Sequence, residues 1–281
     1  MRSLTHSQAE AASIGMDMKI LEKRGSLWQW FPVGIGKDGD SLVIDWKFVG
    51  EARVTHPFFQ DSLNAIPFNT RLSCQTTTDA LASFRDLNCL EPTAFIFHAS
   101  RCGSTLMSQL LATSPSSIVI SEAPVIDEAL NHCRSGAAEG LRVLKGIVRA
   151  LGQRRHSTEA DYFIKLDSWH ISQLPIIREA YPEVPLFFVY RNPVEILNSH
   201  RKQRGQQMVP GLLDPEVIGL EPIRTHPADL DGYCLNVLIR FFQQAKSFAE
   251  SADLKLIHYN ELPELMWTRF ASYLSIKLSP S

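Results

Sequence analysis

Long apolar runs are absent from this sequence of 281 residues, and so is a large excess of charge of one sign. Nowhere do about 18 apolar residues follow one another, as a membrane-spanning helix requires, so we expect no membrane span. The first residues also lack the apolar core and the small-residue cleavage site of a secretory signal. The formal net charge of -2 provides no basic field of the kind that binds nucleic acid.

The cysteines form neither a C-x-x-C pair nor a zinc-binding spacing. There are five of them: Cys74, Cys89, Cys102, Cys133 and Cys234. An odd number suits free thiols in a reducing compartment. We therefore expect a cytoplasmic protein with no metal site.

The stretch "FIFHASRCGSTLMSQLL" is the most informative part of the sequence. An apolar run stops at a tight polar turn and then resumes with helical periodicity, which predicts a strand that leads directly into a helix. The unpaired N–H groups at such a helix start favour an anion. Gly103 permits a close approach, Ser104 and Thr105 add hydroxyl donors, and Arg101 adds a permanent cation. An ordinary helix cap is the plainer alternative.

This turn differs from the nucleoside-triphosphate loop G-x-x-x-x-G-K-[ST]. His98 stands where that pattern has its first glycine, and Ser104 stands where it has lysine. The sequence therefore predicts a loop for a single phosphate, with its cation before the glycine.

Short apolar runs alternate with amphipathic segments from about residue 92 onward. This alternation predicts a domain over residues 92–281 with a parallel sheet and helices on both faces. Residues 1–91 instead contain short aromatic runs separated by Gly, Asp and Pro, which predict a small N-terminal β-containing region.

Ligands of such sheets bind beyond the carboxyl ends of the strands. Charged residues stand at four of these predicted ends: Arg101, Glu122, Lys165 with His170 nearby, and Arg191. Each has a plain explanation alone, because charged residues often begin loops. Together they predict a site with three cations and one carboxylate.

"VYRNPVEILNSHRKQ" fixes Arg191 between a predicted strand and a predicted helix. Asn192 is a good helix N-cap, Pro193 is favoured at the first helical position, and Glu195 stands at the capping-box position. Ser199 follows Arg191 by eight residues, about two helical turns later.

"FHASRCGSTL" and "VYRNPVEILNSH" together resemble the two nucleotide-binding signatures of the sulfotransferase superfamily, over roughly residues 92–259. The stretch from "IKLDSWH" to "VYRNP" also resembles the bacterial branch. The resemblance implies a P-loop-like fold, the co-substrate 3′-phosphoadenosine-5′-phosphosulfate (PAPS), and a small-molecule or carbohydrate acceptor. It also implies that Arg101, Cys102, Gly103, Ser104 and Thr105 hold the 5′-phosphosulfate. Arg191 and Ser199 would then bind the 3′-phosphate.

Sulfuryl transfer requires an aligned acceptor, a base and stabilised charge on the bridging oxygen. Arg101 and Lys165 are our candidates for stabilising that charge. Glu122 and His170 are candidates for the base, and related enzymes favour Glu122. Cys102 at a helix start suggests a nucleophile, but no partner base identifies it as one.

Two other functions remain open. The family often has Lys at the position of Arg101 and Trp at that of Leu106, and many members carry a Gly- and Lys-containing C-terminal motif that is missing here. A non-catalytic nucleotide- or phosphate-binding relative is therefore one alternative. A small-molecule kinase is the other, and the absent loop lysine opposes it. The acceptor is not identified by the long Pro- and Gly-rich stretch over residues 204–232.

Overall fold

The computed structural model describes residues 26–39, 41–67, 71–136, 139–220, 226, 228–251, 253–268, 270 and 272. Its larger sheet has five parallel strands in the order β5-β6-β4-β7-β8. These strands are β4 (Ala94–His98), β5 (Ser117–Ser121), β6 (Asp161–Lys165), β7 (Leu186–Tyr190) and β8 (Leu254–His258). The predicted parallel sheet is therefore confirmed.

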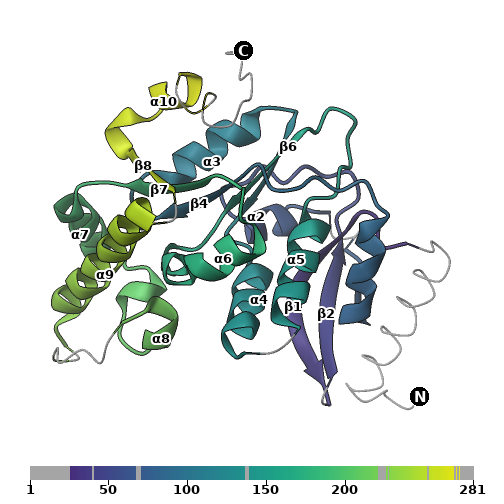
Figure 1. Cartoon of the computed structure of the whole chain (residues 1–281), viewed down its shortest axis with the longest axis horizontal. Helices are drawn as coiled ribbons and strands as arrows, with labels where there is room; N and C mark the ends of the chain where they lie inside the picture. The colour runs from purple at the N-terminus through teal and green to yellow at the C-terminus, as the bar shows by residue number, and fades with distance from the viewer. Residues whose placement is uncertain are drawn as a thin grey trace, which may run out of the picture.

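Helices cover both faces of this sheet (Figure 1). In Figure 1, α3 (Ser104–Thr113) and α10 (Glu264–Trp267) lie on one side. The other side carries α4 (Pro124–Arg134), α5 (Gly140–Leu151), α6 (Leu174–Ala180) and α9 (Leu230–Ser251). The direction of the connections explains this division. The connection from β4 to β5 runs toward the β5 edge of the sheet, whereas the later connections run toward the β8 edge. Because connections between parallel strands are right-handed, opposite directions place their helices on opposite faces.

Further helices and 3-10 turns lie in the connections. They are α2 (Phe59–Asn64), α7 (Pro193–Lys202), α8 (Pro215–Ile218) and the 3-10 turns η2 (Thr78–Arg85), η3 (Ser168–Gln173), η4 (Gln206–Met208) and η5 (Tyr259–Glu261). No helix among the described residues is both long and apolar enough to cross a membrane.

Each strand of the large sheet is a run of five residues, and the strands inside the sheet are mostly apolar and buried on both faces. All five residues of β4 and all five of β5 are buried. With side chains packed on both faces, only the loops after the strands remain open to a ligand.

The N-terminal part forms a separate antiparallel sheet in the order β1-β2-β3, with β1 (Trp30–Asp38), β2 (Ser41–Phe48) and β3 (Ser73–Thr77). Figure 1 shows β1 and β2 beside α4 and α5. Trp30, Phe31 and Trp46 are fully buried and belong to the same apolar cluster as the large sheet. The two sheets therefore share one core.

Polar side chains of the large domain also contact the backbone of the small sheet. Gln153 accepts from Gln29 N at 2.8 Å and donates to Trp30 O at 2.6 Å. Arg155 donates to Ala52 O at 2.6 Å, and Glu128 accepts from Ile35 N at 2.5 Å. These contacts fix the small sheet against α4 and α5.

Candidate functional site

The turn after β4 has an unusual backbone. Ser100 has φ 63°, Arg101 has φ 47° and Gly103 has φ 89°. Non-glycine residues adopt this left-handed region at a cost of about 1–2 kcal/mol each, and such strain clusters at functional sites. The turn brings the chain directly from the strand into α3.

The N-terminus of α3 has no side-chain cap. Gly103 is its N-cap residue and provides no side chain to accept from the first turn of the helix. The first N–H groups of a helix have no acceptor within the helix, and the helix dipole also favours negative charge there. The geometry of the turn is thus compatible with the oxyanion site that the sequence predicts.

A cavity of about 450 Å³ opens beside this turn. Its wall comes from five places: the turn itself, the loop after β5, the loop after β6, the stretch after α7, and Phe58 of the N-terminal part. The described residues that line it are Phe58, His98, Ser100–Thr105, Glu122, Asp167, Ser168, Trp169, Gln203 and Gly205–Gln207. The predicted residues Arg101, Cys102, Gly103, Ser104, Thr105 and Glu122 are thus brought together.

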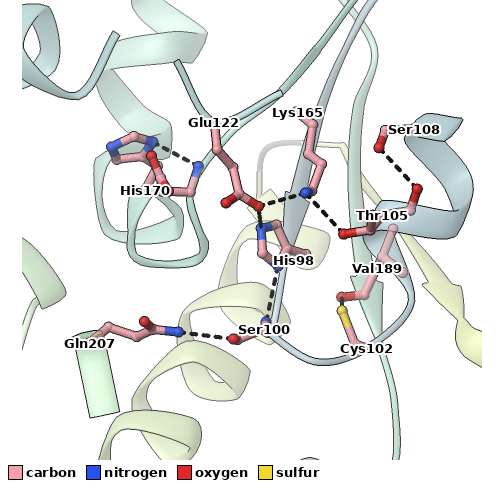
Figure 2. Close-up of polar contacts among 11 residues, drawn as sticks. His98, Ser100, Cys102, Thr105, Ser108, Glu122, Lys165, His170, Val189 and Gln207 are labelled. Carbon is pink, nitrogen blue, oxygen red and sulfur yellow. Dashed lines mark hydrogen bonds and ion pairs between the residues drawn. The ribbon is translucent and has the colours of Figure 1, made fainter. Parts of the chain in front are cut away.

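Lys165 lies between Glu122 and Thr105, two residues that line the cavity (Figure 2). Its side chain is 1% exposed, and Nζ lies 2.6 Å from Glu122 Oε1 and 3.4 Å from Thr105 Oγ1. This ammonium therefore reaches both the carboxylate after β5 and the first turn of α3.

His98 completes the same network. Its Nδ1 accepts from Ser100 N at 3.1 Å, so the proton of the neutral ring is on Nε2. Nε2 lies 3.2 Å from Glu122 Oε1, so its proton faces the carboxylate. Burial lowers the pKa of His98, which keeps the ring neutral.

These contacts set the ionisation of Glu122. Burial works to raise its pKa, but His98 and Lys165 outweigh that effect and lower the pKa to about 2. Glu122 is therefore a carboxylate at neutral pH, and Oε1 is already shared by two partners.

Arg101 and Cys102 point in different directions. Arg101 Nη2 donates to Gln203 O at 2.9 Å, which ties the turn to the stretch after α7. Cys102 is fully buried, and its Sγ donates to Val189 O at 3.0 Å (Figure 2). Burial raises the pKa of the Cys102 thiol to about 11, so the thiol is not poised as a nucleophile.

His170 lies outside the lining of the cavity. Its Nδ1 accepts from Asp167 N at 3.2 Å, and its Nε2 donates to Asp127 Oδ1 at 2.7 Å. Trp169 Nε1 donates to the same Asp127 oxygen at 2.7 Å. The ring is 1% exposed and holds the start of η3 in place.

Arg191 and the turn after β4 both contact the ring of Tyr259. Its guanidinium carbon is 4.5 Å from the centre of the Tyr259 ring, and Nε donates to Glu195 at 2.8 Å. A Cβ added to Gly103 would lie 2.7 Å from Tyr259 Cε2, so that ring packs directly on the glycine. Ser199 is half-buried further along α7.

The sequence predicted the start of α7 in detail. Asn192 caps the helix by accepting from Val194 N at 2.9 Å, and Pro193 begins it. Glu195 pairs with Arg191 instead of completing a capping box.

Among the residues not identified from the sequence, three follow or end strands of the large sheet: His98, Asp167 and Tyr259. His98 is the last residue of β4, Asp167 follows β6 by two residues, and Tyr259 directly follows β8. All three therefore lie at the carboxyl ends of strands, where ligands of parallel sheets bind.

No protein-family model and no curated protein matches this chain. Among solved structures, the chain is similar to sulfotransferase STF9 from Mycobacterium avium, at 13% identity and a TM-score of 0.45, over 70% of this chain and 67% of that one. It is also similar to the sulfotransferase domain from the curacin biosynthetic pathway, at 14% identity and a TM-score of 0.42, over 69% of this chain and 77% of that one.

Proposed function

We propose that this chain is a sulfotransferase that moves a sulfuryl group from PAPS to a hydroxyl or amine of a small-molecule or carbohydrate acceptor. The observation that carries the proposal is the position of Tyr259. Its ring packs on Gly103 of the turn and beneath the guanidinium of Arg191. The two stretches that resemble nucleotide signatures, 90 residues apart in the chain, therefore meet across one aromatic ring.

The 5′ side of the nucleotide would bind at the start of α3. The N–H groups of Ser104 and Thr105 would donate to its oxygens, and Gly103 leaves room for them. The 3′-phosphate would bind near Arg191 and Ser199. The Arg191 guanidinium is held in place by Glu195 and Tyr259, so little ordering is needed when the phosphate arrives.

Charge on the bridging oxygen would be stabilised by Lys165 and Arg101. Lys165 is buried, where a cation acts more strongly than in water, and Glu122 holds it in position. Glu122→Gln should therefore lower the rate of transfer while leaving nucleotide binding in place.

The N-terminal part would form one wall of the acceptor site. Phe58 lies at the start of α2, is 41% exposed, and its ring centre is 5.1 Å from Lys165 Nζ. An exposed aromatic face over the reacting end of the cavity suits a sugar ring or an aromatic acceptor. The free state of all five cysteines supports our placement of the protein in the cytoplasm.

The experiment that tests this function is calorimetric titration of the full chain with 3′-phosphoadenosine-5′-phosphate, and separately with ATP and magnesium. We expect tighter binding of the former, with no requirement for magnesium. Preference for ATP with magnesium would instead indicate a kinase. Binding of the bisphosphate without any turnover of PAPS would indicate the non-catalytic relative.

Arg191→Ala tests whether the 3′-phosphate of the nucleotide binds near Arg191. It should weaken the 3′-phosphorylated nucleotide by one to two decades, since a charge-assisted hydrogen bond contributes roughly 1.5–3 kcal/mol. Adenosine 5′-phosphosulfate, which lacks the 3′-phosphate, should bind almost unchanged. Arg101→Ala is the matched control and should weaken both ligands. Equal losses in the Arg191 variant would refute the placement.

A further inference from the structure

Two carboxylates line the same cavity, Glu122 after β5 and Asp167 after β6. The resemblance to sulfotransferases favours Glu122 as the base. The two carboxylates differ, however, in the partners that surround them. When neighbouring carboxylates have opposite environments, their roles in acid–base chemistry differ.

Glu122 is occupied. Its Oε1 lies 2.6 Å from the ammonium of Lys165 and 3.2 Å from Nε2 of His98. A proton placed on this carboxylate would weaken both contacts and leave the buried ammonium of Lys165 poorly compensated. The same two contacts hold its pKa at about 2, which makes Glu122 a weak base at neutral pH.

Asp167 is oriented but not neutralised. Its carboxylate accepts from the backbone N–H of His170, while the His170 ring accepts from Asp167 N at 3.2 Å. This reciprocal pair fixes the direction of the side chain at the start of η3. Among the described residues, no ion pair involves Asp167, whereas the neighbouring Asp127 takes the hydrogen bonds of both His170 and Trp169.

We propose that Asp167, and not Glu122, receives the proton of the acceptor, and that Glu122 acts by positioning Lys165. In this step, which rests on the proposed function, the acceptor O–H proton passes to the Asp167 carboxylate. The acceptor oxygen forms its bond to sulfur. The bond from sulfur to the bridging phosphate oxygen breaks, and its electron pair stays on the phosphate. Lys165 stabilises the charge that develops there.

The surroundings of Asp167 support this role. Burial is the largest influence on its pKa and raises it, and the carboxylates of Glu122 after β5 and Asp127 on α4 raise it further. His170 on η3 and Lys165 on β6 oppose the rise, and the pKa of Asp167 is about 7. A base with a pKa near the working pH combines adequate basicity with a large unprotonated fraction.

The test compares Asp167→Asn, Asp167→Glu and Glu122→Gln with the parent chain, with Asp86→Asn as an exposed control that lines no part of the cavity. Sulfate release from PAPS is followed from pH 5.5 to 8.5 with water as the acceptor. Carbon-13 NMR of labelled aspartate carboxyls is recorded over the same range with 3′-phosphoadenosine-5′-phosphate bound.

We expect Asp167→Asn to bind the bisphosphate nearly as well as the parent and to lose about 10²–10⁴-fold in rate. It should also lose the rise in rate with pH. Asp167→Glu should recover part of the rate with a displaced midpoint. Glu122→Gln should keep the rise but move its midpoint to lower pH, because a negative neighbour of Asp167 is gone. In NMR, one aspartate should titrate near neutrality and disappear in Asp167→Asn.

An Asp167→Asn protein that releases sulfate at the parent rate would overturn this inference, as would the absence of an aspartate that titrates near neutrality. Loss of the pH-dependent rise in Glu122→Gln, with the rise retained in Asp167→Asn, would return the role to Glu122. Failure of the parent chain to bind the bisphosphate would instead refute the proposed function.

Discussion

Gly103→Ala should disrupt the turn after β4 in two ways that can be measured separately. The first is backbone strain, because alanine in the left-handed region that Gly103 occupies (φ 89°) costs about 1–2 kcal/mol. The second is steric, because the new methyl group would lie 2.7 Å from Cε2 of Tyr259 and nearer still to Cδ2. Displacing that ring costs about 1–3 kcal/mol, typical of an overpacked contact. The free energy of unfolding should therefore fall by about 2–5 kcal/mol.

Gly211→Ala supplies the matched control. Gly211 has φ 81°, and no described atom lies within 4 Å of the position of its added methyl group. This substitution carries the backbone cost alone, so it should lower the free energy of unfolding by about 1–2 kcal/mol. The difference between the two glycine variants measures the contact with Tyr259.

Urea unfolding of Gly103→Ala, Tyr259→Ala and the double variant completes the cycle. Because Tyr259→Ala removes the ring that the methyl group would strike, the double variant should be more stable than the sum of the single effects predicts, by about 1–3 kcal/mol. Gly103→Ala should also weaken binding of 3′-phosphoadenosine-5′-phosphate, since the displaced ring no longer supports Arg191. Additive effects, together with equal losses for both glycine variants, would show that Tyr259 does not pack on the turn.

Three further outcomes follow from the burial of charged and titratable groups. The pKa of Asp167 rises from 3.8 to about 7, so the folded protein holds that proton more tightly than the unfolded chain does. The free energy of unfolding should therefore fall as the pH rises from the lower to the higher of these two values. Asp167→Asn should flatten that part of the profile of melting temperature against pH. Cys102, with its thiol pKa raised to about 11, should resist iodoacetamide at pH 8 until the protein unfolds, and mass spectrometry that finds it modified in the native protein would contradict its buried hydrogen bond. Lys165→Met should lower the free energy of unfolding, measured with urea, by about 3–5 kcal/mol, because the Glu122 carboxylate loses its partner. Adding Glu122→Gln should restore part of that loss. A double variant as unstable as Lys165→Met would refute the pairing.

The five strands of the large sheet were predictable because each is an apolar run set off by polar residues. The runs that predict them cover residues 93–98, 117–121, 161–166, 185–190 and 254–259, and each agrees with the observed strand within one residue at either end. β3 was missed because "SCQTT" is polar, lies at a sheet edge and alternates between exposed and half-buried positions. α2 was missed because it lies in a stretch broken by Pro57 and Pro67, and α4 begins without a polar cap residue.

Convergence of the site was predictable from topology, since parallel strands end at one edge of the sheet. Arg101 and Glu122 both line the cavity at that edge, and Lys165 pairs with Glu122. The direction of each side chain was not predictable, because it depends on local turns. His170 follows β6 by only five residues, yet the 3-10 turn η3 directs its ring to Asp127, while Asp167 is left to line the cavity.

The contacts along β1 have a consequence for how copies of this protein meet in solution. An edge strand with free N–H and C=O groups is a template on which a strand of another molecule can pair, and repeated pairing leads to aggregation. Here Gln153 and Glu128 occupy Gln29 N, Trp30 O and Ile35 N at that edge. The opposite edge is the short polar strand β3. The side chains that join the two sheets therefore also occupy part of the edge on which another strand could pair.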